Sequence, residues 1–252
     1  MIVAVDLNCD LGESFGAYEI GNDAEVIRYI SSANVACAFH AGDPRVMQRT
    51  VALAKKYGVA VGAHVGYPDL VGFGRREMSL SGEELKTDIL YQIGALAAFC
   101  RAEHVPLRHV KPHGAMYNMA NKDARLARAI TEAVAAFDPN LLVFAQPGSQ
   151  LAQAAGNAGL RVIHEVFADR AYQADGSLVS RSVPGAVIKD PGEVVKRVLD
   201  MVLRRKVGTI DGLEIALDAE TICVHGDNPG ALALVVAIRE QLQAAGVKIS
   251  PP

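Results

Sequence analysis

The chain has 252 residues, of which 50% are hydrophobic, and its formal net charge at pH 7 is −3. The length suits one domain of barrel size or two small ones, and a near-neutral chain without a basic run argues against nucleic acid and acidic membranes as partners. No apolar stretch reaches the roughly 18–20 residues of a membrane-spanning helix, and the N-terminus lacks the basic start and cleavage site of a signal peptide. We therefore expect a cytoplasmic protein with a large hydrophobic core.

Short apolar runs typical of β-strands alternate with helix-like segments along the whole chain. The expected strands are, in chain order, Val3–Cys9, Asn34–Phe39, Ala60–His64, Leu107–Lys111, Leu141–Gln146, Arg161–Val166 and Thr221–His225. The expected helices are Ala24–Ile30, Pro44–Lys56, Gly82–Glu103, Ala124–Phe137, Ser149–Gly156, Pro191–Arg205 and Pro229–Ala244. Pro44, Pro191 and Pro229 fit the first turn of a helix, and Ser81 fits a helix N-cap. Asp175–Val187 is expected to form a loop or hairpin inserted after the sixth strand, and Gly208–Leu217 a small hairpin.

This order of elements predicts the fold class. Seven strand–helix units in succession favour a parallel sheet, and no Pro/Gly-rich linker divides residues 1–252. Polar clusters follow all but one of the expected strands, whereas an open sheet would concentrate them at one switch point. We therefore predict a single α/β domain, a seven-stranded parallel (β/α) barrel resembling a TIM barrel.

Charged and polar side chains are concentrated where the expected strands end, and the carboxyl ends of parallel strands form the face that binds ligands. Because successive side chains of a strand face opposite sides, Asp6, Asn8 and Asp10 should point into the barrel. The same alternation places further polar residues inside: His109, Lys111 and His113, Glu165 and Asp169, His225 and Asp227, with His40 and His64 at strand ends. Lys111 would then neutralise Asp6 or Asp10, a coupling that is common in active sites.

These polar groups also have structural interpretations. A single buried histidine such as His109 is more often a hydrogen-bonded core residue than a catalyst, and Glu165 with Arg170 fits a structural ion pair equally well. Five polar residues taken together are harder to explain by a structural role alone, because so many unpaired polar groups inside the barrel would lower the stability of the fold. That set is Asp10, His40, His64, Lys111 and His113.

The sequence leaves open whether the polar site binds a metal ion. Asp10, His40 and His64 end three neighbouring strands and would suit Zn²⁺ or Mn²⁺ as an Asp-His-His site. The same groups fit a metal-free hydrogen-bonding site. Because the sequence shows no carboxylate placed to orient either histidine, we favour the metal-free site.

Other site types are not indicated. The chain has no GxxxxGK[ST], GxGxxG, HExxH or GxSxG motif. The four cysteines, Cys9, Cys37, Cys100 and Cys223, include no CxxC pair, so we expect buried reduced thiols and no zinc-cysteine site.

Several segments together resemble one known family. They are DLNCDLGES, ANVACAFHAGDP, GAHVGYPD, GFGRR, VKPHGAMYN, EVFADRAY, LVSRSVPGAVI and ICVHGDNP, and in this order they extend from Asp6 to Pro229. No single segment is specific, but the set is. The chain resembles the family of the 5-oxoprolinase A subunits, also known as the LamB/YcsF family.

The resemblance implies an activity. Members look like one component of a prokaryotic 5-oxoprolinase that works together with B and C subunits. The complex opens the lactam of 5-oxo-L-proline to L-glutamate and couples this step to hydrolysis of ATP, with Mg²⁺ expected alongside the ATP. The implied fold is a barrel similar to that of polysaccharide deacetylases and some glycoside hydrolases. A homo-oligomer is left open.

The chemistry suggests roles for the residues. A lactam is a stable amide, and phosphorylation of its carbonyl oxygen would activate it toward water, which requires cations, a base and a carboxylate anchor. The catalytic candidates are Asp10, His40, Asp43, His64, Lys111 and His113, with Asp10 or Asp43 as base and the histidines transferring protons. The candidates for binding substrate and phosphate are Asp6, Asn8, Glu13, Arg75, Arg76, Glu165, Asp169, Arg181, His225 and Asp227, with Arg181 holding the substrate carboxylate.

Two alternative functions remain open. The first is a metal-dependent hydrolase or deacetylase acting on an N-acyl sugar through Asp10, His40 and His64, an idea based on fold analogy. The second is a non-catalytic subunit that binds substrate or regulates its partners.

Overall fold

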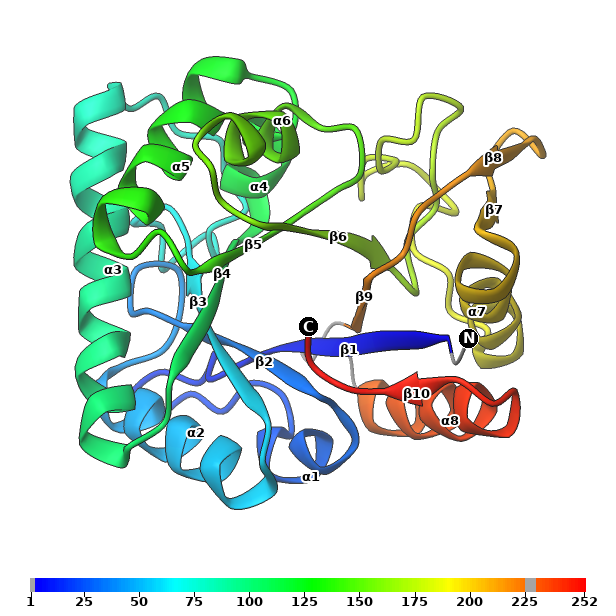
Figure 1. Cartoon of the computed structure of the whole chain (residues 1–252), viewed down its shortest axis with the longest axis horizontal. Coiled ribbons are helices and arrows are strands. Elements are labelled where there is room, and N and C mark those ends of the chain that lie inside the picture. The colour runs from blue at the N-terminus through cyan, green and yellow to red at the C-terminus, as the bar shows by residue number, and fades with distance from the viewer. Residues whose placement is uncertain (1–2, 225–229) are drawn as a thin grey trace.

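The computed structural model describes residues 3–224 and 230–252. Within these residues, seven parallel strands form a closed barrel, as the sequence predicted (Figure 1). They are β1 (Ala4–Leu11), β2 (Ser32–Ala36), β3 (Ala60–Val65), β4 (Leu107–Pro112), β5 (Leu142–Ala145), β6 (Val162–Phe167) and β9 (Thr221–Val224). Each strand pairs with the next, and β9 pairs with both β6 and β1, which closes the ring.

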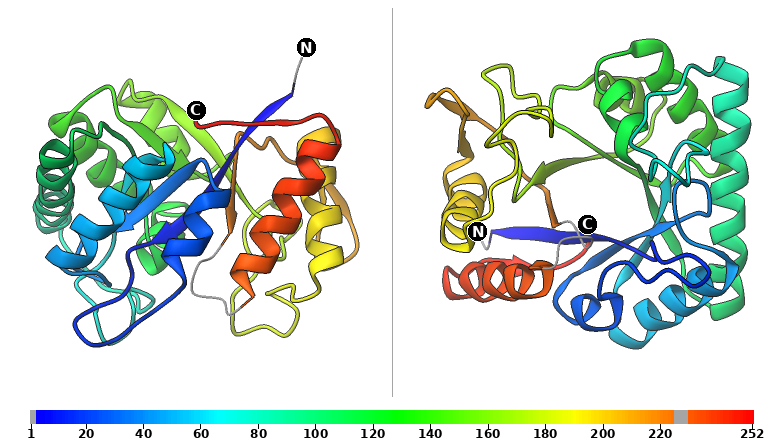
Figure 2. Two further views of the ribbon diagram at one scale, coloured as in Figure 1. Left: turned by 90° about the horizontal axis from the view of Figure 1, so that it is seen from below. Right: turned by 180° about the vertical axis from the view of Figure 1, so that it is seen from behind.

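Helices cover the outside of the barrel (Figure 2). They are α1 (Asp23–Val26), α2 (Pro44–Tyr57), α3 (Gly82–Glu103), α4 (Gly114–Ala120), α5 (Ala124–Phe137), α6 (Gln150–Asn157), α7 (Pro191–Leu199) and α8 (Ala231–Ala244), with a 3₁₀ turn η1 (Ile27–Tyr29) and a π-helical turn η2 (Asp200–Arg204). Among the described residues, no helix is both long and hydrophobic enough to cross a membrane.

Local signals define where several helices begin. Asp43 caps α2 by accepting hydrogen bonds from the backbone N–H groups of Arg45 and Val46, and Pro44 occupies the first turn. Ser81 and Glu84 form a reciprocal capping box at the start of α3. The predicted cap at Ser81 and the predicted position of Pro191 in the first turn of α7 are also confirmed. Pro229 lies outside the described residues.

Some predicted boundaries were wrong. β2 begins and ends before the predicted strand 34–39 does, and just beyond it Ala38 has a φ of 71°, which ends the extended conformation. Two elements were not predicted from the sequence: the short helix α4 and the strand β10 (Lys248–Ile249), which pairs with the start of β1. The predicted hairpin at 208–217 is present as β7 (Lys206–Gly208) and β8 (Glu214–Ala216), and the inserted segment 175–187 is made of turns and isolated bridges.

The barrel wall separates an apolar outer layer from a polar interior. In β1, Val5, Leu7 and Cys9 belong to the buried hydrophobic core. The alternate residues make polar contacts across the interior instead, as shown by the bonds of Asp6 to Ser32 and of Asp10 to Lys111. The predicted alternation of β1 is therefore confirmed. All four cysteines are buried and free, also as predicted.

Candidate active site

Toward the N-terminal end of β1, the barrel interior contains a network in which the Asp6 carboxylate is fully hydrogen-bonded. Its carboxylate accepts hydrogen bonds from Ser31 Oγ (2.6 Å), Ser32 Oγ (2.8 Å) and Thr221 Oγ1 (2.5 Å). Burial raises the pKa of Asp6 to about 6, although these hydroxyls act in the opposite direction. Asp6 was predicted to bind substrate or phosphate, but in the structure its carboxylate is hydrogen-bonded to these three hydroxyl groups of the barrel.

The next layer is an amide–imidazole network. Asn34 Nδ2 lies 2.8 Å from both Asn8 Oδ1 and Asp10 Oδ1, and Asn34 Oδ1 lies 2.7 Å from His109 Nε2. The His109 ring stacks on Phe144 at 4.0 Å, and burial lowers its pKa to about 3, so it is neutral. Gly62 makes room for this ring, since a Cβ there would lie 2.1 Å from it. Asn8 and His109 therefore support the layer above.

Lys111 lies between two buried carboxylates. Its Nζ is 2.8 Å from Asp10 Oδ1, 2.9 Å from Glu165 Oε1 and 3.1 Å from Cys223 Sγ. Burial by itself would lower the pKa of Lys111, but the charges of Asp10 and Glu165 outweigh it and raise the pKa well above its ordinary value. Lys111 is therefore a fixed cation. Of the two predicted partners, Asp10 pairs with it and Asp6 does not, and Glu165 contacts Lys111 and not Arg170.

Three histidines and a glutamate meet beside Asp10. His40 and His113 stack with ring centroids 3.8 Å apart, and His64 packs edge-on against both. His64 Nε2 lies 2.9 Å from His113 Nδ1 and 3.4 Å from Asp10 Oδ2. Glu13 Oε1 lies 3.5 Å from His40 Nε2 and 3.7 Å from His113 Nδ1. One ligand atom from each of Glu13, His40, His64 and His113 lies within 4.8 Å of the others.

Burial keeps two of these histidines neutral. It lowers the pKa of His40 and His113 well below the ordinary value, and the neighbouring histidines lower both further. The loop before α3 covers both rings. Gly74 has a φ of 62°, and a Cβ there would lie 2.7 Å from His40 Cβ and 2.8 Å from His113 Cδ2, so only glycine fits.

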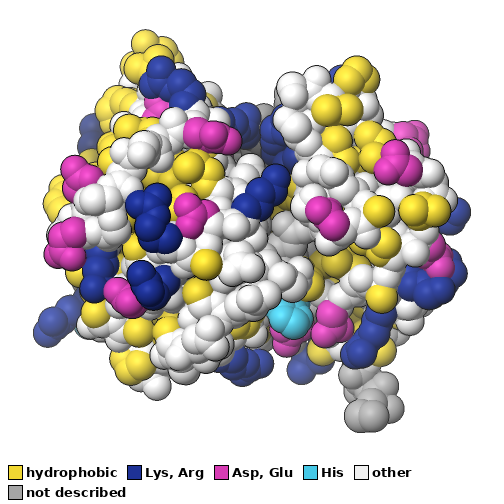
Figure 3. All heavy atoms as spheres, turned by 90° about the horizontal axis from the view of Figure 1, so that it is seen from above, with side chains coloured by type: hydrophobic (Ala, Val, Ile, Leu, Met, Phe, Trp, Pro, Cys, Tyr) yellow, Lys and Arg dark blue, Asp and Glu magenta, His cyan; other side chains and the backbone are white. Residues whose placement is uncertain are grey.

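A cavity of about 830 Å³ opens above Lys111. Asp10, Glu13, His64, Lys111 and His113 line one part of it. Its other walls come from α4, the turn before α6 and the loop after β6. Seen from above, the molecule is hollowed between two lobes, and lysine and arginine side chains gather along the hollow (Figure 3).

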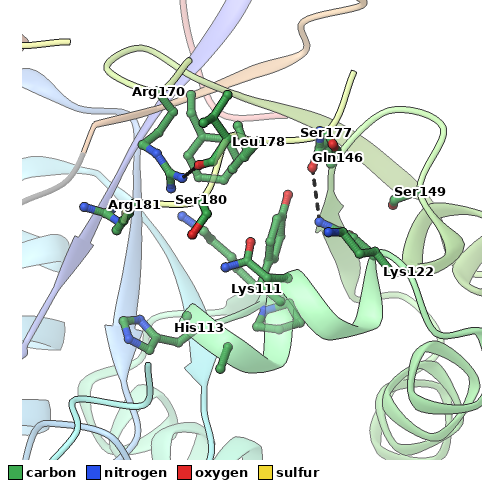
Figure 4. A pocket seen from close by; sticks show the side chains of 18 of the residues that line it. Lys111, His113, Lys122, Gln146, Ser149, Arg170, Ser177, Leu178, Ser180 and Arg181 are labelled. Atoms are coloured by element: carbon green, nitrogen blue, oxygen red, sulfur yellow. Dashed lines mark hydrogen bonds between the residues drawn. The ribbon is translucent and has the colours of Figure 1, made fainter. Parts of the chain in front are cut away.

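The loop after β6 supplies cationic side chains to this cavity. Arg170 and Arg181 lie above Lys111 and His113 (Figure 4), and Arg75 also lines the cavity. Arg170 Nη2 donates a hydrogen bond to the Val179 carbonyl at 2.6 Å. Burial, and then the charge of Arg181, lower the pKa of Arg170 to about 10. Several guanidinium groups lining one cavity favour an anionic ligand.

Several predicted site residues lie elsewhere. Asp43 is the cap of α2 and also accepts a hydrogen bond from Gly16 N, so its carboxylate is committed to backbone groups. Arg76 forms an ion pair with Asp69, its side chain is 66% exposed, and it does not line the cavity. Asp169 is buried but is not part of the cavity wall. His225 and Asp227 lie outside the described residues.

Other residues of the site were not predicted from the sequence. Asn34 joins the Asp10 and His109 layers, and its polar side chain inside an apolar strand was the signal that went unused. Tyr117, on the unpredicted helix α4, lines the cavity and packs against Phe167 at 5.7 Å. The carbonyl of Phe73 lies 2.8 Å from His113 Nε2. No sequence pattern points to a backbone carbonyl of this kind.

The structure is similar to solved structures. The crystal structure of a lactam utilization protein from Thermus thermophilus superposes with a TM-score of 0.94 at 53% identity, covering 98% of this chain and 99% of that chain. A family 4 carbohydrate esterase from Streptomyces lividans superposes with a TM-score of 0.50 at 13% identity, covering 98% of this chain and 91% of that one. The second likeness shows a shared barrel fold alone.

Relatives in sequence are closer still. A protein named as the A subunit of 5-oxoprolinase from Symbiobacterium thermophilum is 57% identical over 248 residues, covering 98% of this chain and 95% of that protein. One of the same name from Pyrococcus abyssi is 58% identical over 247 residues, covering 98% and 97%. The LamB/YcsF family model matches residues 5–252, and this chain therefore belongs to the LamB/YcsF family.

Proposed function

We propose that this chain is the A subunit of an ATP-dependent 5-oxoprolinase, which opens the lactam of 5-oxo-L-proline to L-glutamate together with B and C subunits. The observation that carries the proposal is the fixed Lys111 cation, held by Asp10 and Glu165 at the base of an 830 Å³ cavity with guanidinium groups on its other side. The names of the close relatives support the same activity.

The chemistry needs activation of a poor electrophile. Transfer of the γ-phosphoryl group of ATP to the lactam carbonyl oxygen gives an imidate phosphate. Water adds to its carbon, the C–N bond breaks with nitrogen leaving as the amine, and a second water releases phosphate from the acyl phosphate. The sum is 5-oxoproline, ATP and two waters converted to glutamate, ADP and phosphate. Mg²⁺ accompanies the ATP, as phosphoryl transfer requires.

The site residues fit separate parts of this reaction. Lys111 stabilises negative charge that develops on the carbonyl or phosphoryl oxygens. Asp10, which lines the cavity and contacts both Lys111 and Asn34, is the base that takes a proton from water. Arg181 holds the carboxylate of 5-oxoproline, with Arg170 and Arg75 beside it. Asp43 is not retained as a base, because its carboxylate caps α2.

The chain is expected to need its partners. The sequence contains no Walker-type phosphate loop, and the relatives are named as one subunit of an enzyme. The test combines the purified chain with the B and C subunits, 5-oxoproline and ATP, and measures glutamate and ADP, with each component omitted in turn. We expect glutamate and ADP in equal amounts from the full set and little or none from the chain alone.

The same assays separate the alternatives. Robust ATP-dependent glutamate release from the chain alone would contradict the dependence on partners. A rate that requires the chain but is unchanged when Lys111→Met replaces the wild type would favour the non-catalytic subunit. Acetate release from an N-acetylated sugar without ATP would favour the deacetylase, for which the structure offers a shared fold and no closer likeness.

A further inference from the structure

We propose that Glu13, His40, His64 and His113 form a binding site for a divalent transition-metal ion of the zinc class. This set differs from the Asp10, His40 and His64 site considered from the sequence, because Glu13 and His113 complete the group of ligand atoms within 4.8 Å and Asp10 does not. The inference concerns metal binding by the isolated chain, so it does not depend on the proposed function.

The first observation is a contact between two lone pairs. His64 Nδ1 lies 3.0 Å from the Lys111 carbonyl, and His113 Nε2 lies 2.8 Å from the Phe73 carbonyl. Carbonyl oxygens only accept hydrogen bonds, so both of these ring nitrogens carry the proton. In two neutral rings with these tautomers, the other nitrogens, His64 Nε2 and His113 Nδ1, bear lone pairs that face each other at 2.9 Å. A cation between them removes this repulsion.

The second observation is the state of His40. Its ring is fully buried, and neither of its nitrogens makes a hydrogen bond with the described residues. Buried polar groups without such a partner are rare and costly. His40 Nε2 faces Glu13 Oε1 at 3.5 Å, inside the same group of atoms. A metal ion would give this nitrogen the partner that the protein does not.

The dimensions and chemistry agree with zinc. Ligand atoms about 2.0–2.1 Å from a tetrahedral Zn²⁺ lie about 3.4 Å from one another. The distances of 2.9, 3.5 and 3.7 Å within the cluster lie near that value, and no two of the four ligand atoms are more than 4.8 Å apart. Three imidazoles and one carboxylate suit Zn²⁺ or Co²⁺, whereas Mg²⁺ prefers oxygen ligands.

The outer contacts also fit a metal site. Histidine ligands usually donate their second ring N–H to a carbonyl or carboxylate, which fixes the tautomer. The carbonyls of Lys111 and Phe73 do this for His64 and His113. The sequence favoured a metal-free site because it showed no carboxylate placed to orient His40 or His64. The structure supplies a carbonyl in that role for His64. Glu13, His64 and His113 also line the cavity, which gives an ion a route in.

The test is metal binding by the purified chain. Protein prepared without chelator is assayed for bound metals, stripped, and titrated with Zn²⁺ against a competing chromophoric chelator, with Mg²⁺ as comparison. We expect one Zn²⁺ per chain and no competition from equimolar Mg²⁺. Glu13→Gln and His40→Gln should each weaken Zn²⁺ binding by at least about tenfold. In crystals with Zn²⁺, anomalous density should lie among the four side chains.

Controls separate this site from surface binding. The matched control replaces two histidines outside the cluster, His104→Asn and His164→Gln, and should bind Zn²⁺ as tightly as the wild type. Melting temperatures check that each variant folds, and Glu13→Gln, which preserves side-chain shape, keeps the test open if His40→Gln does not fold. Wild-type protein without stoichiometric Zn²⁺, both cluster variants with unchanged affinity, or loss of Zn²⁺ only in the surface control would each overturn the proposal.

Discussion

Lys111 determines both the proposed chemistry and the balance of charge in the barrel interior. It is the cation that separates Asp10 from Glu165, and all three side chains are buried. Removing one member of a buried ion pair is costly, because the remaining charge keeps its desolvation penalty. The same side chain should therefore matter to stability and to activity, and the two effects can be measured separately.

We predict that Lys111→Met abolishes glutamate formation by the assembled complex and lowers the free energy of unfolding by about 3–5 kcal/mol. The matched control is Lys56→Met on the exposed surface of α2, which should change neither quantity. Activity is measured as glutamate release, and stability by urea denaturation. Full activity in the Lys111→Met complex would remove this residue from the mechanism, whatever its effect on stability.

Asp6 provides a pH-dependent contribution to stability. Its pKa is raised from 3.8 to about 6 by burial, so the folded state holds its proton where the unfolded chain releases it. Stability from the protonated form is complete below pH 3.8 and is lost as the pH rises through 6. The loss amounts to about 3 kcal/mol at neutral pH, because each pKa unit corresponds to about 1.4 kcal/mol.

We predict that Asp6→Asn removes this loss. The stability of the variant relative to the wild type should rise by about 2.4 kcal/mol between about pH 4 and pH 7. Urea denaturation of both proteins across this range measures the difference, which cancels the opposing titration of His109, whose pKa is lowered to about 3. A difference that stays constant with pH would show that Asp6 does not titrate in this window.

At the scale of elements, the loop between β3 and α3 acts as a cover for the histidine cluster. The Phe73 carbonyl contacts His113, the Gly74 carbonyl accepts from Ala115 N, and Gly74 lies against both His40 and His113. This loop therefore depends on a backbone conformation that other residues rarely adopt. A change in the shape of this loop would therefore move the imidazole rings of His40 and His113, which it contacts.

We predict that Gly74→Ala destabilises the protein and reduces the activity of the complex. The left-handed backbone costs about 1–2 kcal/mol for a residue with a Cβ, and the new Cβ also meets His40 and His113 below 3 Å. Gly94→Ala, inside α3 with no atom within 4 Å, is the matched control and should stabilise by about 0.5–1 kcal/mol. Equal melting temperatures for the two variants would contradict this role of Gly74.

At the scale of the whole molecule, the four thiols report on the integrity of the barrel. Cys9, Cys37 and Cys223 are fully buried, and Cys100 is 2% exposed. Burial raises the pKa of Cys100 to about 12 and those of the other three also above their ordinary values, which suppresses the reactive thiolate.

We predict that native protein resists alkylation by iodoacetamide, whereas denatured protein takes up a label on every cysteine. Mass spectrometry counts the labels as a function of urea concentration. Ala98→Cys, which adds an exposed thiol on α3, should be labelled at once in the native state and serves as the positive control. Rapid labelling of any native cysteine would show local opening of the barrel below its unfolding transition.

The sequence by itself determined the parts of this protein that depend on local patterns. The alternation of Asp6, Asn8 and Asp10 with apolar residues in β1 predicted an inward polar face, because side chains of a strand alternate between its faces. Ser81 before Glu84 predicted a helix start, because the capping contacts span three residues. The order of strands and helices predicted the barrel, and the barrel brought Asp10, His64, Lys111 and His113 together.

Only the tertiary structure decided which partners meet. Lys111 is 101 residues from Asp10 and pairs with it and with Glu165, whereas Asp6 is satisfied by hydroxyl groups. Neighbours in sequence separate as well: Arg75 reaches the cavity while Arg76 pairs with Asp69 outside it. Glu13 joins three histidines because strand closure sets its distance to them. Such distances depend on the register of all the strands around the barrel and on the conformations of the loops that connect them. Short-range sequence patterns do not determine these features.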